Sequence, residues 1–136
     1  MNETDILNAK ILIVDDAEAN LKLLEDLLTR EGFHQIISTS DSTRALDLFI
    51  AFQPDLILLD LMMPRMDGFE FLDHFRRDPR YVHTPVIVVT AKDLTEEDRG
   101  RLSGRVHSLI TKDGSIVKKL LPQLQAYLPH PAAKSS

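Results

Sequence analysis

The stretch Asp55-Leu56-Ile57-Leu58-Leu59-Asp60 places four consecutive apolar residues between two aspartates. A continuous apolar run of this length is typical of a strand buried on both faces, as in a parallel sheet covered by helices. An aspartate directly after such a strand stands where open parallel sheets bind their ligands. The stretch therefore predicts both a fold class and the position of a functional site.

Similar runs recur along the chain and predict five strands: Lys10–Val14, Gln35–Thr39, Asp55–Leu59, Pro85–Val89 and Arg105–Ile110. The stretches between them have helical periodicity, as in the apolar face formed by Leu21, Leu24, Leu27 and Leu28. Strand alternating with helix five times predicts a doubly wound α/β fold. We expect a five-stranded parallel sheet in the flavodoxin-like order 2-1-3-4-5, with five helices.

Local signals predict where several helices begin and end. Gly32 is expected to end the first helix, Asp41 to begin the second, and Thr95 with Asp98 to form a capping box. Pro122 lies inside the periodic stretch of the last helix, where it removes a hydrogen bond. We therefore expect the last helix to kink or restart there.

Length and composition predict one domain and exclude several functions. The 136 residues, 43% hydrophobic and 27% charged, suit a single domain at 9–128 with an N-terminal extension at 1–8 and a disordered tail at 129–136. A net charge of -5 argues against direct nucleic-acid binding and against a polybasic membrane anchor. The chain has no cysteine, no apolar run long enough to span a membrane and no signal-peptide layout. We expect a cytoplasmic protein.

Polar side chains follow four of the five predicted strands. Asp15 and Asp16 follow the first, Asp60 the third and Thr90 the fourth, and Lys112 comes after the fifth. Because the carboxyl ends of parallel strands meet at one edge of a sheet, these groups are expected to gather there.

Three adjacent carboxylates repel one another unless a cation or protons intervene. Mg²⁺ takes oxygen ligands and often bridges carboxylates to phosphate, so Asp15 and Asp16 are candidate metal ligands. An ionised Asp60 could attack phosphorus, with Lys112 offsetting the incoming charge. Hydrogen bonds from Thr90 and from the backbone amide of Ala91 could then hold the phosphoryl oxygens.

Four segments in this order resemble the receiver domains of two-component signalling proteins: Ile11–Asp16, Pro54–Gly68, Pro85–Lys92 and Ile110–Lys112. The resemblance extends over about Ala9 to Leu128 and suits a single-domain receiver of the chemotaxis-regulator type. The stretch from Thr90 to Lys112 also resembles receivers at the carboxyl end of hybrid sensor histidine kinases.

The resemblance implies a signalling switch and not an enzyme in the usual sense. It implies that Asp60 is the phosphoacceptor and that Mg²⁺ binds to Asp15, Asp16, Asp60 and the backbone carbonyl of Met62. Thr90 would be the switch hydroxyl and Lys112 the phosphate-contacting lysine, in a site that also catalyses its own dephosphorylation. The expected partners are a sensor histidine kinase or a histidine phosphotransfer protein and a downstream protein target. A homodimer is left open.

Two positions depart from the family pattern. Leu109 stands where many receivers carry a Tyr or Phe that moves with the switch hydroxyl. Asp113 replaces a proline whose peptide bond with the lysine is often cis; a non-proline cis bond costs about 3 kcal/mol, so a trans bond is expected. With these departures, a pseudo-receiver that only binds partners is a second hypothesis.

A phosphohydrolase and a nucleotide-binding domain fit the sequence less well. A phosphohydrolase of the haloacid dehalogenase type needs a second aspartate two residues after the nucleophile, where Met62 stands. A nucleotide-binding domain needs a glycine-rich loop after the first strand, where Asp15-Asp16-Ala17-Glu18 stands instead. The five histidines are dispersed, so no phosphotransfer histidine is expected.

Overall fold

Strands and helices alternate along the chain in the computed structural model, which describes residues 7–63, 67–79, 84–91, 93–104, 106–112 and 116–128. Over these residues the elements are β1 (Lys10–Val14), α2 (Glu18–Arg30), β2 (Gln35–Thr39), α3 (Ser42–Phe52), β3 (Leu56–Leu59), α4 (Gly68–Arg76), β4 (Val86–Thr90), α5 (Glu96–Leu102), β5 (Ser108–Thr111) and α6 (Ile116–Tyr127). The strands form one parallel sheet in the order β2-β1-β3-β4-β5. The predicted fold class and strand order are confirmed.

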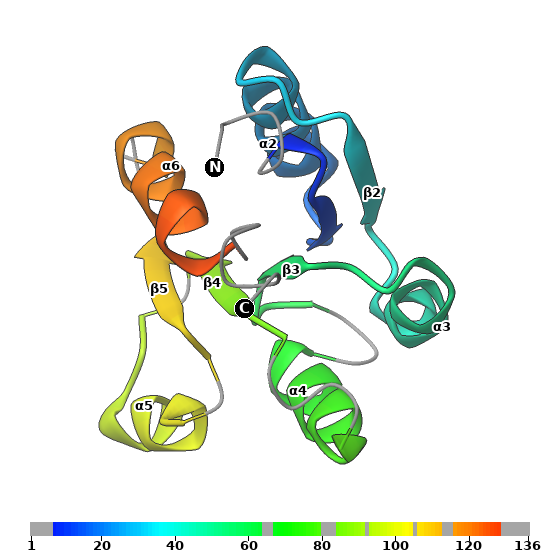
Figure 1. Cartoon of the computed structure of the whole chain (residues 1–136). Coiled ribbons are helices and arrows are strands. Elements are labelled where there is room, and N and C mark those ends of the chain that lie inside the picture. The colour runs from blue at the N-terminus through cyan, green and yellow to red at the C-terminus, as the bar shows by residue number, and fades with distance from the viewer. Residues whose placement is uncertain are drawn as a thin grey trace.

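The sheet lies between two layers of helices. Helices α2 and α6 cover one face, and α3, α4 and α5 cover the other (Figure 1). Successive side chains of a strand point to opposite faces, so Ile11 and Ile13 pack toward α2 and α6 while Leu12 and Val14 pack in the second layer. This burial on both faces explains why the central strands are apolar without interruption.

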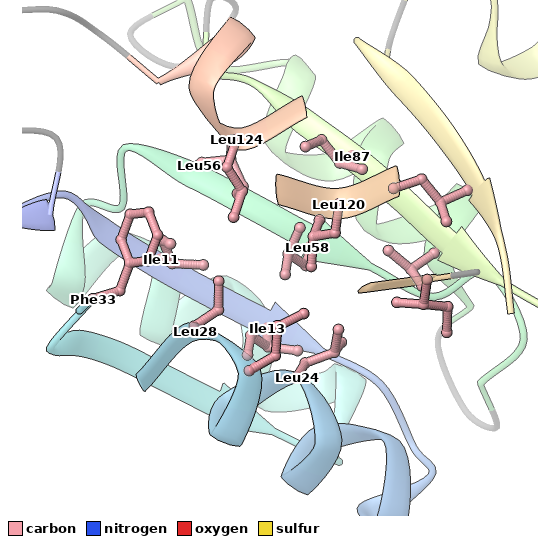
Figure 2. Close-up of a cluster of buried hydrophobic side chains, with 14 of the residues drawn as sticks. Ile11, Ile13, Leu24, Leu28, Phe33, Leu56, Leu58, Ile87, Leu120 and Leu124 are labelled. Carbon is pink, nitrogen blue, oxygen red and sulfur yellow. The ribbon is translucent and has the colours of Figure 1, made fainter. Parts of the chain in front are cut away.

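The core between the sheet and the α2–α6 layer is built from leucines at helical spacing. Leu24 and Leu28 of α2 and Leu120 and Leu124 of α6 converge on the strands around Leu58 (Figure 2). None of these five is more than 1% exposed. Each such leucine contributes about 1.5–3 kcal/mol through burial of apolar surface. Packing of this strength fixes the sheet and hence the ends of its strands.

Helix α6 continues through Pro122 as one helix. A restart at this proline, one of the two expected outcomes, is not observed. Pro122 is exposed, whereas Leu120 and Leu124 on either side of it are buried against the sheet. Tertiary packing of these leucines therefore outweighs the loss of one backbone hydrogen bond.

The predicted helix ends are confirmed. Asp41 is the N-cap of α3, and its side chain accepts a hydrogen bond from the Thr43 amide at 2.9 Å. Thr95 and Asp98 form a reciprocal capping box at the start of α5. Gly32 follows α2 with φ of 103°, a conformation that glycine adopts without steric cost.

Strand bounds differ slightly from those predicted. Strand β5 begins at Ser108, not at residue 105, because its pairing with β4 starts opposite Ile87. Strand β4 extends to Thr90, so this residue ends the strand instead of following it.

At the termini, Leu7 packs against the core cluster shared by α2 and α6. The predicted tail at 129–136 and residues 1–6 lie outside the described residues. Within the described part of the chain, none of the helices has the length and apolar character needed to cross a bilayer.

Candidate functional site

Strand register brings Asp15 and Asp60 together at the carboxyl edge of the sheet. Val14 pairs with Thr39 on one side and with Leu59 on the other, and the two aspartates come one residue later. The hydrogen-bond ladder continues past the strands, since the Asp60 amide donates to the Val14 carbonyl at 2.9 Å and the Asp15 amide to the Thr39 carbonyl at 3.2 Å. The backbone that carries both carboxylates is therefore held by the sheet.

Lys112 bridges these two carboxylates. Its amide donates to the Thr90 carbonyl at 2.9 Å, which continues the β4–β5 ladder. Its Nζ lies 2.8 Å from Asp15 Oδ2 and 2.9 Å from Asp60 Oδ2. The aspartates are 2% and 3% exposed, so solvent screens this contact weakly. The predicted gathering of the first, third and fifth strand ends is thus observed.

Local hydrogen bonds orient each carboxylate further. Asp15 Oδ1 accepts from the Ala17 amide at 2.9 Å, and Asp60 Oδ1 accepts from the Met62 amide at 3.1 Å. Both are turns in which an aspartate bonds to the backbone two residues on. In addition, Asn20 Nδ2 donates to Asp15 Oδ2.

Asp16 completes an acidic cluster that could hold a metal ion. One carboxylate oxygen from each of Asp15, Asp16 and Asp60 lies within 4.8 Å of the others. Asp16 is exposed while its two neighbours are buried, so the cluster opens to water on one side. Carboxylate oxygens with room for water ligands suit a hard divalent cation.

Among the residues that the structure describes, the Lys112 ammonium contacts two of the three clustered carboxylates. Burial raises the pKa of Asp15, an effect that the Lys112 and Ala17 hydrogen bonds reduce and the charge of Asp60 reinforces. Burial lowers the pKa of Lys112, but its hydrogen bonds to the two carboxylates outweigh this, and the pKa is raised. The ammonium therefore stays protonated while the carboxylates still repel one another. A bound cation would relieve this repulsion.

Thr90 and Ala91, the other predicted site residues, lie at the carboxyl end of β4. Thr90 is 1% exposed. Leu59, the residue before Asp60, pairs with Val88, and Thr90 comes two residues after Val88 on the neighbouring strand. Ala91 follows it and is exposed. Leu109, at the departure from the family pattern, is half-buried against the core cluster of the second helix layer. Asp113, the other departure, lies outside the described residues, so its trans peptide bond stays a prediction.

Met62 is 54% exposed at the mouth of the site. It borders a cavity of about 520 Å³ between the β3–α4 connection and α5. Across this cavity the Arg101 guanidinium lies 4.1 Å from the centre of the Phe69 ring, a cation–π contact that joins α5 to α4. The cavity is lined by Asp16, Leu61, Met62, Met63, Asp67, Phe69, Asp98 and Arg101.

Two residues that support the site were missed by sequence reasoning. Gly68 starts α4 so close to Asp60 that a Cβ would lie 2.5 Å from the Asp60 carbonyl oxygen. Asn20 lies in the first turn of α2 and contacts Asp15. A polar residue at the start of the helix that follows Asp15 was a usable signal for Asn20. Nothing in the sequence indicated how near Gly68 lies to Asp60.

Comparisons with known proteins show which family the chain belongs to. The family model described as the response regulator receiver domain matches residues 11–121. The response regulator PleD of Caulobacter vibrioides is 45% identical over 87 residues, which are 64% of this chain but 19% of PleD. The chain thus spans only a small part of that relative. The polar-differentiation response regulator DivK of Brucella anthropi is 34% identical over 118 residues, 87% of this chain and 94% of DivK.

A solved structure shows the same fold. The phosphorylated cyanobacterial phytochrome response regulator RcpA superposes with a TM-score of 0.72 at 27% identity, over 88% of this chain and 90% of RcpA. The resemblance inferred from the four motifs is therefore confirmed. This chain belongs to the response regulator receiver domain family and is a receiver domain homologous to DivK and PleD.

Proposed function

We propose that this receiver domain accepts a phosphoryl group on Asp60 from a sensor histidine kinase or a histidine phosphotransfer protein, and then signals by contact with a downstream protein. The observation that carries the proposal is the position of Lys112 Nζ, within 2.9 Å of Asp60 Oδ2 and 2.8 Å of Asp15 Oδ2. The Lys112 ammonium thus lies beside the buried carboxylate of Asp60. Both are at the carboxyl edge of the sheet, where the exposed Asp16 leaves the site open to a partner protein. The phosphorylated state of the similar protein RcpA supports the same chemistry.

In the proposed reaction, a carboxylate oxygen of Asp60 attacks the phosphorus of a phosphohistidine. The new O–P bond forms as the N–P bond breaks, and the imidazole of the donor leaves. Lys112 is already hydrogen-bonded to Asp60, so its ammonium can follow the added negative charge without a large movement. We assign the hydroxyl of Thr90 and the amide of Ala91 as donors to the phosphoryl oxygens.

The acidic cluster fits Mg²⁺ because it offers three carboxylates and access to water, which match the oxygen ligands that this ion prefers. We propose Asp15, Asp16, Asp60 and the backbone carbonyl of Met62 as its ligands. When bound, the ion offsets the negative charge of the phosphoryl group. Asp15 and Asp16 would hold the ion, while the Lys112 ammonium contacts the Asp15 and Asp60 carboxylates of the same cluster.

Signalling requires that phosphorylation change the part of the protein surface that the downstream protein contacts. We propose that the phosphoryl group draws Thr90 inward and shifts the β4–α5 connection together with α5. Leu109 packs in the core without an aromatic ring to reorient, so Thr90 carries most of the coupling. A phosphorylated Thr90→Ala variant is expected to lose most of its preference for the downstream protein. Partner binding that is unchanged in this variant would contradict the coupling.

The phosphoacceptor is tested by intact-protein mass after incubation with acetyl phosphate and Mg²⁺, and in parallel with a phosphorylated histidine phosphotransfer protein. One phosphoryl group adds about 80 Da, as expected for a single modified site. We expect this mass in the wild type and in the control Asp26→Asn, whose carboxylate is exposed on α2, but not in Asp60→Asn or without Mg²⁺. Absence of the added mass with both donors would favour a pseudo-receiver that only binds partners.

A further inference from the structure

Asn20 makes a contact with the site that the proposed phosphoryl transfer does not by itself require. This half-buried residue is the third residue of α2, and its Nδ2 donates to Asp15 Oδ2. Asp15 is 2% exposed, so its carboxylate depends on protein donors for its orientation. The contact therefore acts on a side chain whose orientation decides what the cluster can bind.

The donors around Asp15 divide into one that is shared and two that are its own. Lys112 Nζ is shared, because it lies 2.8 Å from Asp15 and 2.9 Å from Asp60. The Ala17 amide, at 2.9 Å from Oδ1, and the Asn20 amide on Oδ2 serve Asp15 alone. With one such donor on each oxygen, the plane of the carboxylate is fixed whether or not Lys112 remains in place.

The start of α2 explains why Asn20 reaches this position. The N-cap of the helix is Ala17, whose methyl side chain cannot make a capping hydrogen bond to the first turn. A polar residue at the third helical position often reaches back to the backbone amide of the N-cap. Here Asp15 already accepts from that amide, so Asn20 reaches the second oxygen of the same carboxylate. The positive end of the helix also favours negative charge at Asp15.

We propose that Asn20 is a positioning residue that, together with the Ala17 amide, holds the Asp15 carboxylate in the orientation needed to bind a divalent cation. The inference rests on the proposed function for the identity of the cation. Asn20 itself does not touch the reacting atoms. Its effect reaches the cation through Asp15.

The direct test is calorimetric titration of Mg²⁺ into the unphosphorylated protein. Loss of a residue that orients a metal ligand typically weakens metal binding tenfold or more, so Asn20→Ala is expected to raise the Kd for Mg²⁺ about tenfold. Asn20→Gln keeps an amide donor and is expected to recover most of the affinity. Asn8→Ala is the matched control, since Asn8 is exposed and precedes β1 at the opposite edge of the sheet.

A second readout separates positioning from general loss of structure. Alanine is favourable inside a helix, so circular dichroism is expected to show a folded Asn20→Ala protein. In labelling with acetyl phosphate, the Mg²⁺ concentration for half-maximal rate should rise about tenfold, as the weaker metal binding implies, while the rate at saturating Mg²⁺ stays within about twofold. A lowered saturating rate with unchanged Mg²⁺ dependence would overturn the inference.

The outcomes also distinguish this inference from the proposed function. If the wild type binds Mg²⁺, Asn20→Ala binds it weakly and Asp60 is never phosphorylated, the proposed function fails while the role of Asn20 stands. If Asn20→Ala and wild type bind Mg²⁺ equally, the inference fails even if Asp60 is phosphorylated. If the wild type binds no Mg²⁺, the inference fails as well.

Discussion

Gly68→Ala is expected to destabilise the protein and to displace Asp60, the proposed phosphoacceptor. A Cβ at this position would lie 2.5 Å from the Asp60 carbonyl oxygen and 2.8 Å from Leu61 Cα. Both are backbone atoms, so no side-chain rotation can relieve the clash. Reaching a normal separation of about 3.4 Å requires a backbone shift of about 0.9 Å at Asp60, the proposed phosphoacceptor.

The change in the free energy of unfolding of Gly68→Ala follows from two opposing effects. Overpacking of this kind costs about 1–3 kcal/mol, whereas replacing glycine by alanine in a helix contributes up to about 1 kcal/mol. We expect the free energy of unfolding to fall by about 1–2 kcal/mol and Tm by roughly 3–8 °C. A shift near 1 Å can cost about a hundredfold in rate, so phosphorylation of Asp60 should slow strongly.

Gly100→Ala is the matched control. Gly100 lies within α5, is exposed, and has open space where a Cβ would be added. The same chemical change should therefore raise the free energy of unfolding by about 0.5–1 kcal/mol. Urea denaturation followed by circular dichroism measures both variants. The reasoning is refuted if Gly68→Ala is as stable as the wild type and labels at the same rate, or if the two variants change stability in the same direction.

Three further changes test other parts of the structure. Lys112→Met leaves two buried carboxylates without their cation and should lower the free energy of unfolding by about 2–4 kcal/mol. The control Lys22→Met removes an exposed ion pair and should change the free energy of unfolding by less than about 0.5 kcal/mol. Similar losses in urea denaturation would contradict the assigned ion pair. Partial desolvation, and then the charge of Arg76, lower the pKa of the exposed His107 from its ordinary 6.5. The unfolded chain therefore takes up the proton more readily, and stability should fall as pH drops through 6.5. His107→Phe, which keeps a ring beside Tyr127, should weaken that pH dependence in thermal unfolding; an unchanged profile would assign it to other groups. Pro122→Ala restores a helix hydrogen bond and should raise the free energy of unfolding by about 2 kcal/mol; a loss of stability would mean that the proline ring itself packs favourably.

The parts of the fold that were predicted correctly depend on local pattern. Strands such as Gln35–Thr39 and the capping signals at Asp41 and Thr95 were located correctly because hydrophobic runs and caps act over a few residues. The start of β5 was placed too early because it depends on where β4, a separate element of the chain, offers a pairing partner. The restart at Pro122 was not observed because the packing of neighbouring leucines, a tertiary effect, holds α6 together.

For the site, the sequence by itself determined which residues gather, because parallel strands all end at the same edge of the sheet. Asp15, Asp60 and Lys112 follow from that rule and from their places after apolar runs. The tertiary structure alone decided how they meet, since the register sets the Lys112 bridge and the first turn of α2 brings Asn20 onto Asp15. It also revealed the narrow space that only glycine fills at position 68. A sequence pattern records which face or end of an element a residue occupies, whereas contacts of a few ångströms depend on how separate elements pack in three dimensions.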